Sequence, residues 1–294
     1  MSRKLIYFLA KSDLQRKLMI RSLLITPLFV AVSFFMRSEA LADTIPLAGH
    51  RAVYNLSLLK GEGAKAPIQA QGSIIFEFSG SECQGYVQNF HQLTEIQPAE
   101  GQTKFSEVSS ATYEEPLGKG FRFRTVTKLD NSPGEQVEGM ADRQGKTVTV
   151  HRKADTERPI LLQGEVLFPT QHLLRILKAA DEKETLLEAR IYDGNGEGDK
   201  SLQTLTIIGK ALIVPAQEKI TQSAPLKGMP RWPIVISYYD LGKSDSRPVY
   251  TLSFDLYANG VSRALRLDYG DFVLEGEMKE LNFFPPVSCL AKKQ

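Results

Sequence analysis

The sequence predicts an all-β domain with one minor helix, arranged as a many-stranded antiparallel sheet. From Ile45 onward, apolar and polar residues alternate over most of the chain, which is the period of a half-buried strand. Near the C-terminus, Asn259-Gly260 separates two such runs, a strong signal for a hairpin. One segment of this region has the 3.6-residue period of an amphipathic helix.

The first half of this region contains four clear strand patterns. The inward positions are apolar and their neighbours are mostly polar or small, so each pattern predicts one buried face and one exposed face. The apolar positions are Ala52, Tyr54, Leu56 and Leu58; Ile74, Phe76 and Phe78; Phe121 and Phe123, which alternate with Arg122 and Arg124; and Val148 and Val150.

The helix is predicted from Phe168 to Ala180. Pro169 restricts the backbone at the first turn, and we expect Thr170 to cap the free amides. An apolar stripe is predicted at Leu173, Leu174, Leu177 and Ala180. Because one face is apolar, the helix is expected to plug or cover the sheet.

Strand patterns resume after the helix and end in a meander. The expected strands are 186–193, 202–214, 234–239 and a start at Val249, followed by 252–258, 261–269 and 272–278. The expected loops, rich in Gly, Pro, Lys and Ser, are 61–70, 215–230 and 241–248. None of them is typical of a domain linker, so residues 43–294 are predicted to form a single domain.

The N-terminal region is predicted to be a cleaved export signal, which places the mature protein in the periplasm. Basic residues precede the 14-residue apolar run 23–36, and Ala40-Leu41-Ala42 supplies the small residues that a signal peptidase requires. Cleavage is predicted after Ala42. The alternative is an uncleaved anchor, but the run is shorter than the roughly 20 residues of a spanning helix. Translation starts at Met1 or at Met19.

Removing this segment reverses the sign of the net charge. The whole chain has a formal net charge of +2, whereas residues 43–294 hold 29 basic and 32 acidic residues, a net charge of −3. This balance argues against nucleic-acid binding and against adhesion to an anionic membrane. We expect no stable membrane insertion after cleavage.

Cys83 and Cys289 are the two cysteines of the chain and lie 206 positions apart. In an exported protein, such a pair is expected to form one structural disulfide. A redox-active pair is disfavoured, because the Cys-x-x-Cys spacing is absent.

Several stretches imitate catalytic or ligand motifs. Residues 193–199 resemble a calcium loop, but Thr204 stands where a bidentate Glu belongs, which favours a polar turn. Gly242-Lys243-Ser244 lacks the first glycine of a phosphate-binding loop. Glu275 and Glu277 are expected on a solvated strand face. No metal, cofactor or enzymatic activity is predicted.

The four histidines, His50, His91, His151 and His172, lie in separate segments without metal-ligand spacing. We expect each on the surface of a strand or helix. A nucleophile paired with one of them in space is not excluded, but no Gly-x-Ser-x-Gly motif accompanies them.

Several stretches in consistent order resemble the cell envelope integrity protein B family of periplasmic proteins from alphaproteobacteria. They are His50 to Leu58, Cys83-Gln-Gly85-Tyr86, Phe168-Pro169, Tyr192-Asp193-Gly194, Ile208-Gly209, Pro248-Val-Tyr250, and Asp268 to Phe272 leading to Cys289. The similarity covers nearly all of the mature chain.

The resemblance implies a curled, spiral-like antiparallel sheet, an incomplete barrel whose ends are linked by a disulfide matching Cys83 and Cys289. It also implies a non-catalytic role in keeping the envelope intact under stress. That role would be exercised through periplasmic protein contacts, including a partner built of tetratricopeptide repeats.

Two kinds of binding function remain open from the sequence. The first is a periplasmic interaction protein; the alternative is a carrier of a lipid or another apolar ligand in a lipocalin-like cavity. An envelope hydrolase and an outer-membrane barrel are disfavoured. Tyr86, Trp232 and Tyr239 are candidate contact residues, with core packing as the alternative for each.

Overall fold

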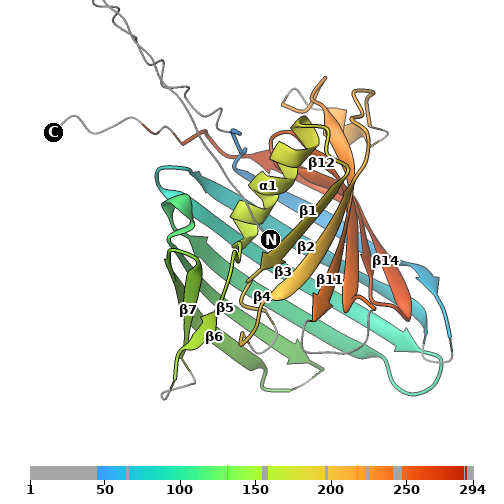
Figure 1. Cartoon of the computed structure of the whole chain (residues 1–294). Coiled ribbons are helices and arrows are strands. Elements are labelled where there is room, and N and C mark those ends of the chain that lie inside the picture. The colour runs from blue at the N-terminus through green and yellow to red at the C-terminus, as the bar shows by residue number, and fades with distance from the viewer. Residues whose placement is uncertain are drawn as a thin grey trace, which may run out of the picture. The chain divides into compact units, whose positions relative to one another are not determined.

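The computed structural model describes residues 45–63, 66–130, 132–153, 158–195, 198–216, 218–222, 225–240, 247–287 and 289 (Figure 1). The chain divides into two compact units, Met1–Ala42 and Asp43–Gln294, and all described residues belong to the second. The predicted export segment, with Met19 and Ala42, and the Gly242-Lys243-Ser244 stretch lie outside the described residues.

The described residues form 14 strands, one α-helix and two short 3-10 helices. The strands before the helix are β1 (His50–Gly61), β2 (Pro67–Ser81), β3 (Gly85–Pro98), β4 (Lys104–Glu114), β5 (Gly120–Leu129), β6 (Glu135–Gln144), β7 (Thr147–Arg152) and β8 (Ile160–Leu162). The helix is α1 (Pro169–Asp181), and the 3-10 helices are η1 (Pro116–Gly118) and η2 (Lys219–Gln222). The remaining strands are β9 (Leu186–Ile191), β10 (Leu202–Ile208), β11 (Arg231–Asp240), β12 (Tyr250–Tyr257), β13 (Ser262–Asp268) and β14 (Phe272–Phe283).

All 14 strands belong to one antiparallel sheet with the order β8-β7-β6-β5-β4-β3-β2-β1-β14-β13-β12-β11-β10-β9. The chain therefore forms two meanders, β1 to β8 and β9 to β14, which join through pairing of β1 with β14. The sheet curls, and α1 lies on its concave side between the two meanders (Figure 1). The predicted fold class is confirmed.

Among the described residues, the two edges of the sheet, β8 and β9, do not pair with each other, and it is the segment after β8 that contacts β9. After β8, the amide of Leu167 donates to the carbonyl of Arg190 at 2.7 Å, and the amide of Tyr192 donates to the carbonyl of Leu167 at 2.9 Å. Leu167 forms an isolated parallel bridge with Ile191 and no ladder follows. The sheet is therefore an incomplete barrel, as the resemblance implies.

The inward side chains form three apolar clusters. One packs α1 against β9 to β12 through Ile176, Leu177, Ile191, Ile234 and Leu256. A second joins β1, β2 and β14. The third is aromatic and stacks Phe121 on Phe168, with ring centroids 5.1 Å apart, beside Phe123 and Tyr192. Gly194 is required there, because its φ of +71° and a Cβ only 2.4 Å from the Phe123 ring would both oppose a side chain.

Helix α1 is present where the sequence predicts it, but its buried face is wider. Ile176 and Ala179 are buried together with Leu177 and Ala180, whereas Leu173 and Leu174 are only partly buried. Leu173 packs against the same core, so the predicted stripe is confirmed at Leu173, Leu177 and Ala180 but omits the buried Ile176 and Ala179. The reason is that α1 contacts β9 and β10 on one side and hydrogen-bonds to β3 and β4 on another.

Several strand limits differ from the prediction. The strand expected over 202–214 ends at Ile208. The chain then contacts β11 through the amide of Gly209, which donates to the carbonyl of Pro233 at 2.7 Å, and through the bridge of Leu212 with Arg231. β9 ends at Ile191, since the amide of Tyr192 bonds to Leu167 instead. The last strand continues to Phe283, because β1 supplies a partner along its whole length.

The sheet is split between β13 and β14. These strands pair only over Leu265–Asp268 and Val273–Gly276. Beyond that point the connection between β10 and β11 packs against the split: η2 contacts β14, and Leu226 is buried in the same cluster as Tyr257 and Val261. The β10–β11 connection therefore covers the core where β13 and β14 do not pair.

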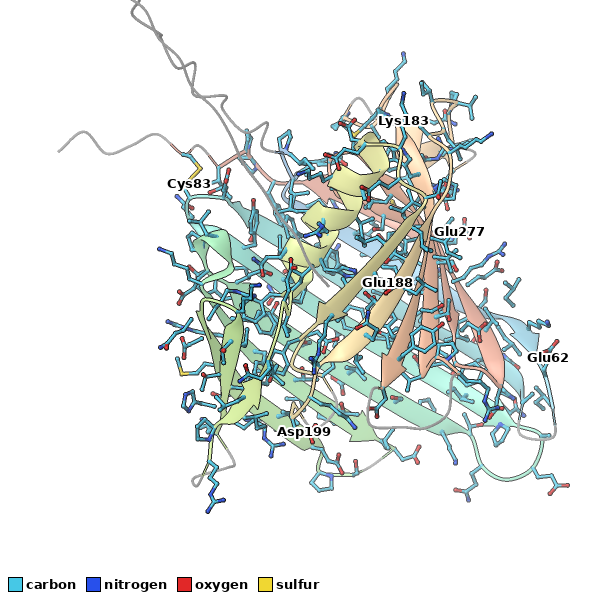
Figure 2. All side chains as sticks on the ribbon, viewed as in Figure 1. Glu62, Cys83, Lys183, Glu188, Asp199 and Glu277 are labelled. Atoms are coloured by element: carbon cyan, nitrogen blue, oxygen red, sulfur yellow. A yellow bond between two sulfur atoms is a disulfide. The ribbon has the colours of Figure 1, made fainter. Side chains whose placement is uncertain are left out.

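Cys83 and Cys289 form the predicted disulfide, with an S–S distance of 2.09 Å and Cα atoms 5.7 Å apart (Figure 2). Cys83 lies in the turn between β2 and β3. The segment after β14 first runs beside β1, where the amide of Phe284 donates to the carbonyl of Gly49 at 2.8 Å. The bond thus attaches the end of the chain to the β2–β3 turn.

Candidate functional site

The outer face of β2 to β7 brings side chains from six strands into rows that cross the sheet. One row consists, in order from β2, of Glu77, Asn89, Ala111, Arg124, Glu138 and Lys153. The adjacent row consists of Val87, Tyr113, Arg122, Met140 and His151. The strand register alone creates both rows, because their members lie far apart in the sequence.

Two adjoining hollows follow these rows. One, of about 480 Å³, lies over β2 to β5, and the other, of about 670 Å³, lies over β3 to β7. They share Asn89, Ala111 and Arg124, and we call the combined surface the outer groove. The surface is deepest in the middle of the groove, because the small side chain of Ala111 lies there beside the larger Tyr113 on β4.

The outer groove is more basic than the rest of the mature chain. Four cationic side chains line it, against two carboxylates: Arg122, Arg124, Lys128 and Lys153 against Glu77 and Glu138. The net charge of residues 43–294 is −3. The sign of the charge therefore changes locally, which favours anionic groups at this surface.

Both lysines at the groove, Lys128 and Lys153, have carboxylate partners. The ammonium of Lys128 lies 3.2 Å from Glu107, and that of Lys153 lies 3.3 Å from Glu138. Hydrogen bonds from His91 and Lys128 lower the pKa of Glu107, so this carboxylate is ionised at neutral pH. Both ion pairs are partly exposed and contribute little to stability.

Arg124 differs from these lysines. Its guanidinium donates to the amide oxygen of Gln136 at 3.0 Å, and among the described residues no carboxylate lies within ion-pair distance of it. Arg122, two positions earlier on the same face, lies 3.5 Å from Glu115 and above the ring of Tyr113. The middle of the groove thus holds a guanidinium with a neutral partner, available to a carboxylate.

Apolar side chains lie beside these charges. Val87 and Met140 are 37% and 41% exposed, and both line the larger hollow. A surface that alternates exposed apolar groups with arginine has the composition of a protein-binding site rather than of a catalytic one.

A second polar site anchors α1 to β4. The carboxylate of Glu114 accepts the amides of Thr170 and Gln171 at 2.7 and 3.1 Å. Burial raises the pKa of Glu114 to about 7, against these hydrogen bonds, which lower it. Arg143 donates to Gln171 at 2.9 Å and stacks on the Phe168 ring at 4.7 Å. This site is best explained as the attachment of the helix.

Thr170 does not cap the helix, contrary to the prediction. Phe168 is the N-cap residue and Pro169 occupies the first helical position, so Thr170 already lies inside the first turn. Its hydroxyl accepts a hydrogen bond from Gln88 on β3 at 3.0 Å. Glu114, which is distant in sequence, satisfies the free amides instead.

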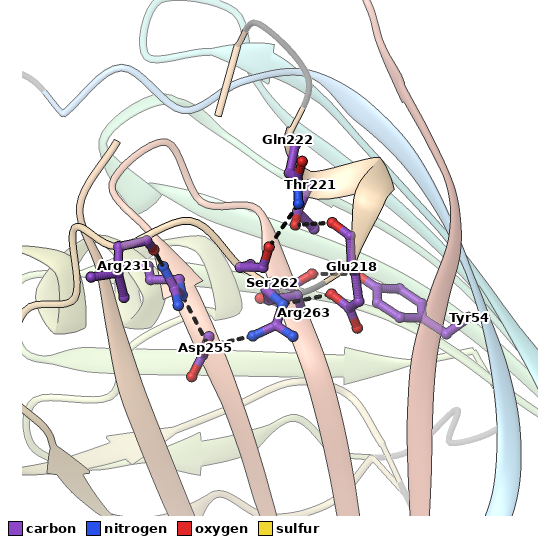
Figure 3. Close-up of polar contacts among 10 residues, drawn as sticks. Tyr54, Glu218, Thr221, Gln222, Arg231, Asp255, Ser262 and Arg263 are labelled. Atoms are coloured by element: carbon purple, nitrogen blue, oxygen red, sulfur yellow. Dashed lines mark hydrogen bonds and ion pairs between the residues drawn. The ribbon is translucent and has the colours of Figure 1, made fainter. Parts of the chain in front are cut away.

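A charge cluster supports the split between β13 and β14 (Figure 3). Asp255 accepts from Arg231 at 3.1 Å and from Arg263 at 2.6 Å, and Arg263 also donates to Glu218 at 2.6 Å. Nearby, the hydroxyl of Tyr54 donates to the carbonyl of Ser262 at 2.7 Å. Because every charge has an opposite partner, this cluster attaches the β10–β11 connection to the sheet rather than offering a site for a ligand.

The histidines divide into two groups. His91 and His151 lie on the outer face, as predicted. The prediction was wrong for His50 and His172, which are 1% and 5% exposed. His50 lies among Phe76, Phe78 and Phe283, and burial lowers its pKa; burial also lowers the pKa of His172 to about 4. Both are therefore neutral core residues.

The other candidates lie apart from one another. Trp232 is buried in the core and Tyr86 stacks on Phe78, whereas Tyr239 is partly buried. Asp193 accepts the amide of Asn195 at 3.0 Å, as in a polar turn; Gly196 and Glu197 lie outside the described residues.

Comparisons with known proteins identify the family. The family described as EipB-like matches residues 41–285. The chain belongs to this family. As an EipB-like protein, it is 31% identical over 252 residues to the cell envelope integrity protein EipB of Brucella abortus (strain 2308), covering 85% of this chain and 89% of that protein.

The fold of this EipB-like chain also matches a crystal structure from Brucella abortus, a beta-barrel-like protein of domain of unknown function DUF1849. The TM-score is 0.76 at 29% identity, covering 82% of this chain and 100% of the other. These relationships support a role in cell envelope integrity. The curated relative is named for that role and not for an enzymatic activity. Among the residues that the structure describes, no helix has both the length and the apolar character needed to cross a membrane.

Proposed function

We propose that this chain is a non-catalytic periplasmic protein that maintains the cell envelope by binding a protein partner in its outer groove. Membership in the EipB-like family supports the envelope role. The observation that supports binding is the outer groove itself, where Arg124 has no carboxylate partner among the described residues and Val87 and Met140 remain exposed. A partner built of tetratricopeptide repeats, implied by the resemblance, fits this proposal.

The distribution of buried groups favours the outer face of the sheet, rather than its interior, as the binding site. On the concave side, α1 packs against β9 to β12 and its N-terminus is attached to Glu114. The two hollows of the outer groove lie on the opposite face of the sheet. A protein partner at the groove leaves the core intact, whereas an apolar ligand inside the sheet would compete with α1.

The experiment is affinity purification of the mature protein from its native host, with mass spectrometry of proteins and of organic-extractable molecules. The test variant is Ala111→Tyr, which fills the groove; the matched control is Ser57→Tyr, at another exposed position on the outer face. We expect a stoichiometric protein with the wild type and with Ser57→Tyr, and its loss with Ala111→Tyr. A partner retained by Ala111→Tyr, or an apolar molecule at one per chain without a protein, would overturn the proposal.

A further inference from the structure

We infer that the outer groove binds an extended acidic segment of the partner, about seven residues long, with two carboxylates about three positions apart. This inference rests on the proposed function and adds the chemistry of the partner. It follows from the order of side chains along the groove.

The length of the bound segment follows from the spacing of the strands that the groove crosses. The groove extends from Glu77 on β2 to Lys153 directly after β7, which are six neighbouring strands. Five spacings of about 4.8 Å give about 24 Å, and an extended chain advances about 3.1 to 3.4 Å per residue. About seven residues therefore span the groove.

The charge pattern follows from the rows. In order along the groove, Val87 on β3 is apolar, Arg122 and Arg124 on β5 are cationic, Met140 on β6 is apolar, and Lys153 after β7 is cationic. The cationic positions are two strand spacings apart, about 10 Å. In a segment with the polyproline II conformation, which has three residues per turn and rises about 3.1 Å per residue, side chains three positions apart lie on the same side and about 9 Å apart. Carboxylates at that spacing would meet Arg124 and Lys153, with apolar side chains between them.

Arg124 is expected to make the strongest contact. One of its nitrogens donates to Gln136, which leaves the other donors of the guanidinium for a carboxylate. Lys153 already has Glu138 as a partner and adds a weaker, shared contact.

A protein segment is favoured over an anionic membrane. Glu77 and Glu138 lie within the groove and would repel a continuous anionic surface. A single peptide segment is not repelled in this way, because its carboxylates can lie opposite Arg124 and Lys153 and away from Glu77 and Glu138. The net charge of −3 on the mature chain also opposes adsorption to anionic lipid.

The experiment uses the mature protein and a fluorescein-labelled heptapeptide that carries two glutamates three positions apart among leucine and serine. The second probe replaces both glutamates by lysine, and the third is a phosphatidylglycerol vesicle. Fluorescence anisotropy measures binding for wild type, Arg124→Gln and the control Arg266→Gln, an exposed arginine on β13 outside the groove. Melting temperatures confirm that the variants are folded.

We expect the glutamate peptide to bind, the lysine peptide to bind at least about tenfold more weakly, and Arg124→Gln to weaken the glutamate peptide by about tenfold. Arg266→Gln should have no effect. Equal binding of both peptides, no effect of Arg124→Gln, or binding of the vesicle without binding of the peptide would overturn the inference.

The inference and the proposed function fail in different ways. If Ala111→Tyr abolishes capture of the native partner while Arg124→Gln changes neither capture nor peptide binding, the acidic-segment inference is wrong and the proposed function stands. If Arg124→Gln weakens the glutamate peptide while Ala111→Tyr leaves native capture intact, the chemistry of the groove stands and its proposed function is wrong.

Discussion

Asp255 holds two arginines in place at the split between β13 and β14, so Asp255→Asn tests how this split is stabilised (Figure 3). The substitution keeps the size of the side chain and removes its charge. Among the contacts described, Arg231 then keeps the carbonyl of Val214 and the ring of Tyr257 but no carboxylate, while Arg263 keeps Glu218.

The expected loss of stability follows from burial. The side chains of Arg231, Asp255 and Arg263 are 7%, 18% and 13% exposed. Breaking a buried ion pair by removing one partner costs 3–5 kcal/mol as an order of magnitude. Because Arg263 keeps one carboxylate, we expect the lower end, about 3 kcal/mol. With a urea slope of about 3 kcal/mol per molar, the midpoint falls by about 1 M.

Urea unfolding followed by far-UV circular dichroism measures this change. The control is Glu280→Gln, which removes one partner of the exposed pair formed with Arg51 and should cost less than about 1 kcal/mol. If Asp255→Asn costs no more than this control, the cluster does not stabilise the split and the reasoning is wrong.

Three further predictions concern other parts of the fold. Replacing Cys83 or Cys289 by Ser should lower stability by up to about 5 kcal/mol, the chain-entropy value for a loop of this length, and should mimic reduction; equal melting temperatures with and without reductant would refute this. Since burial raises the pKa of Glu114 to about 7, its contribution is fully present below about pH 4.5 and is lost as pH rises toward 7, by up to about 3 kcal/mol. Glu114→Gln should remove that slope from urea titrations between pH 4.5 and 8, and an unchanged slope would contradict the assignment. Leu177→Ala in α1 should cost about 2–5 kcal/mol, because Leu177 is 2% exposed, and Leu174→Ala, at a partly buried position, should cost less; similar thermal stabilities would count against the packing described.

The features that the sequence predicts well are local. The Asn259-Gly260 turn joins β12 and β13, and α1 begins at Pro169. Each depends on residues within a few positions, where periodicity and backbone preference act together. The cap of α1 was missed because its acceptor, Glu114, lies 56 positions away.

The strands β3, β4 and β6 have no clear pattern in the sequence. The inward positions of β3 and β4 include Gln88, Gln92, Ser106 and Ser110, so both faces of these two strands are polar over much of their length. The outer groove was missed for the same reason. The alternation of Arg122 and Arg124 with Phe121 and Phe123 is visible in the sequence, but the register that adds Ala111 and Met140 is a property of the folded sheet.

The most direct test of a partner in the outer groove is site-specific photocrosslinking in the native host, with a photoreactive amino acid at position 111 and, as a control, at position 57. The account predicts one dominant protein adduct at Ala111, absent at Ser57 and reduced by Arg124→Gln. Adducts at both positions alike, or none at Ala111 while the purified protein still captures its partner, would contradict it.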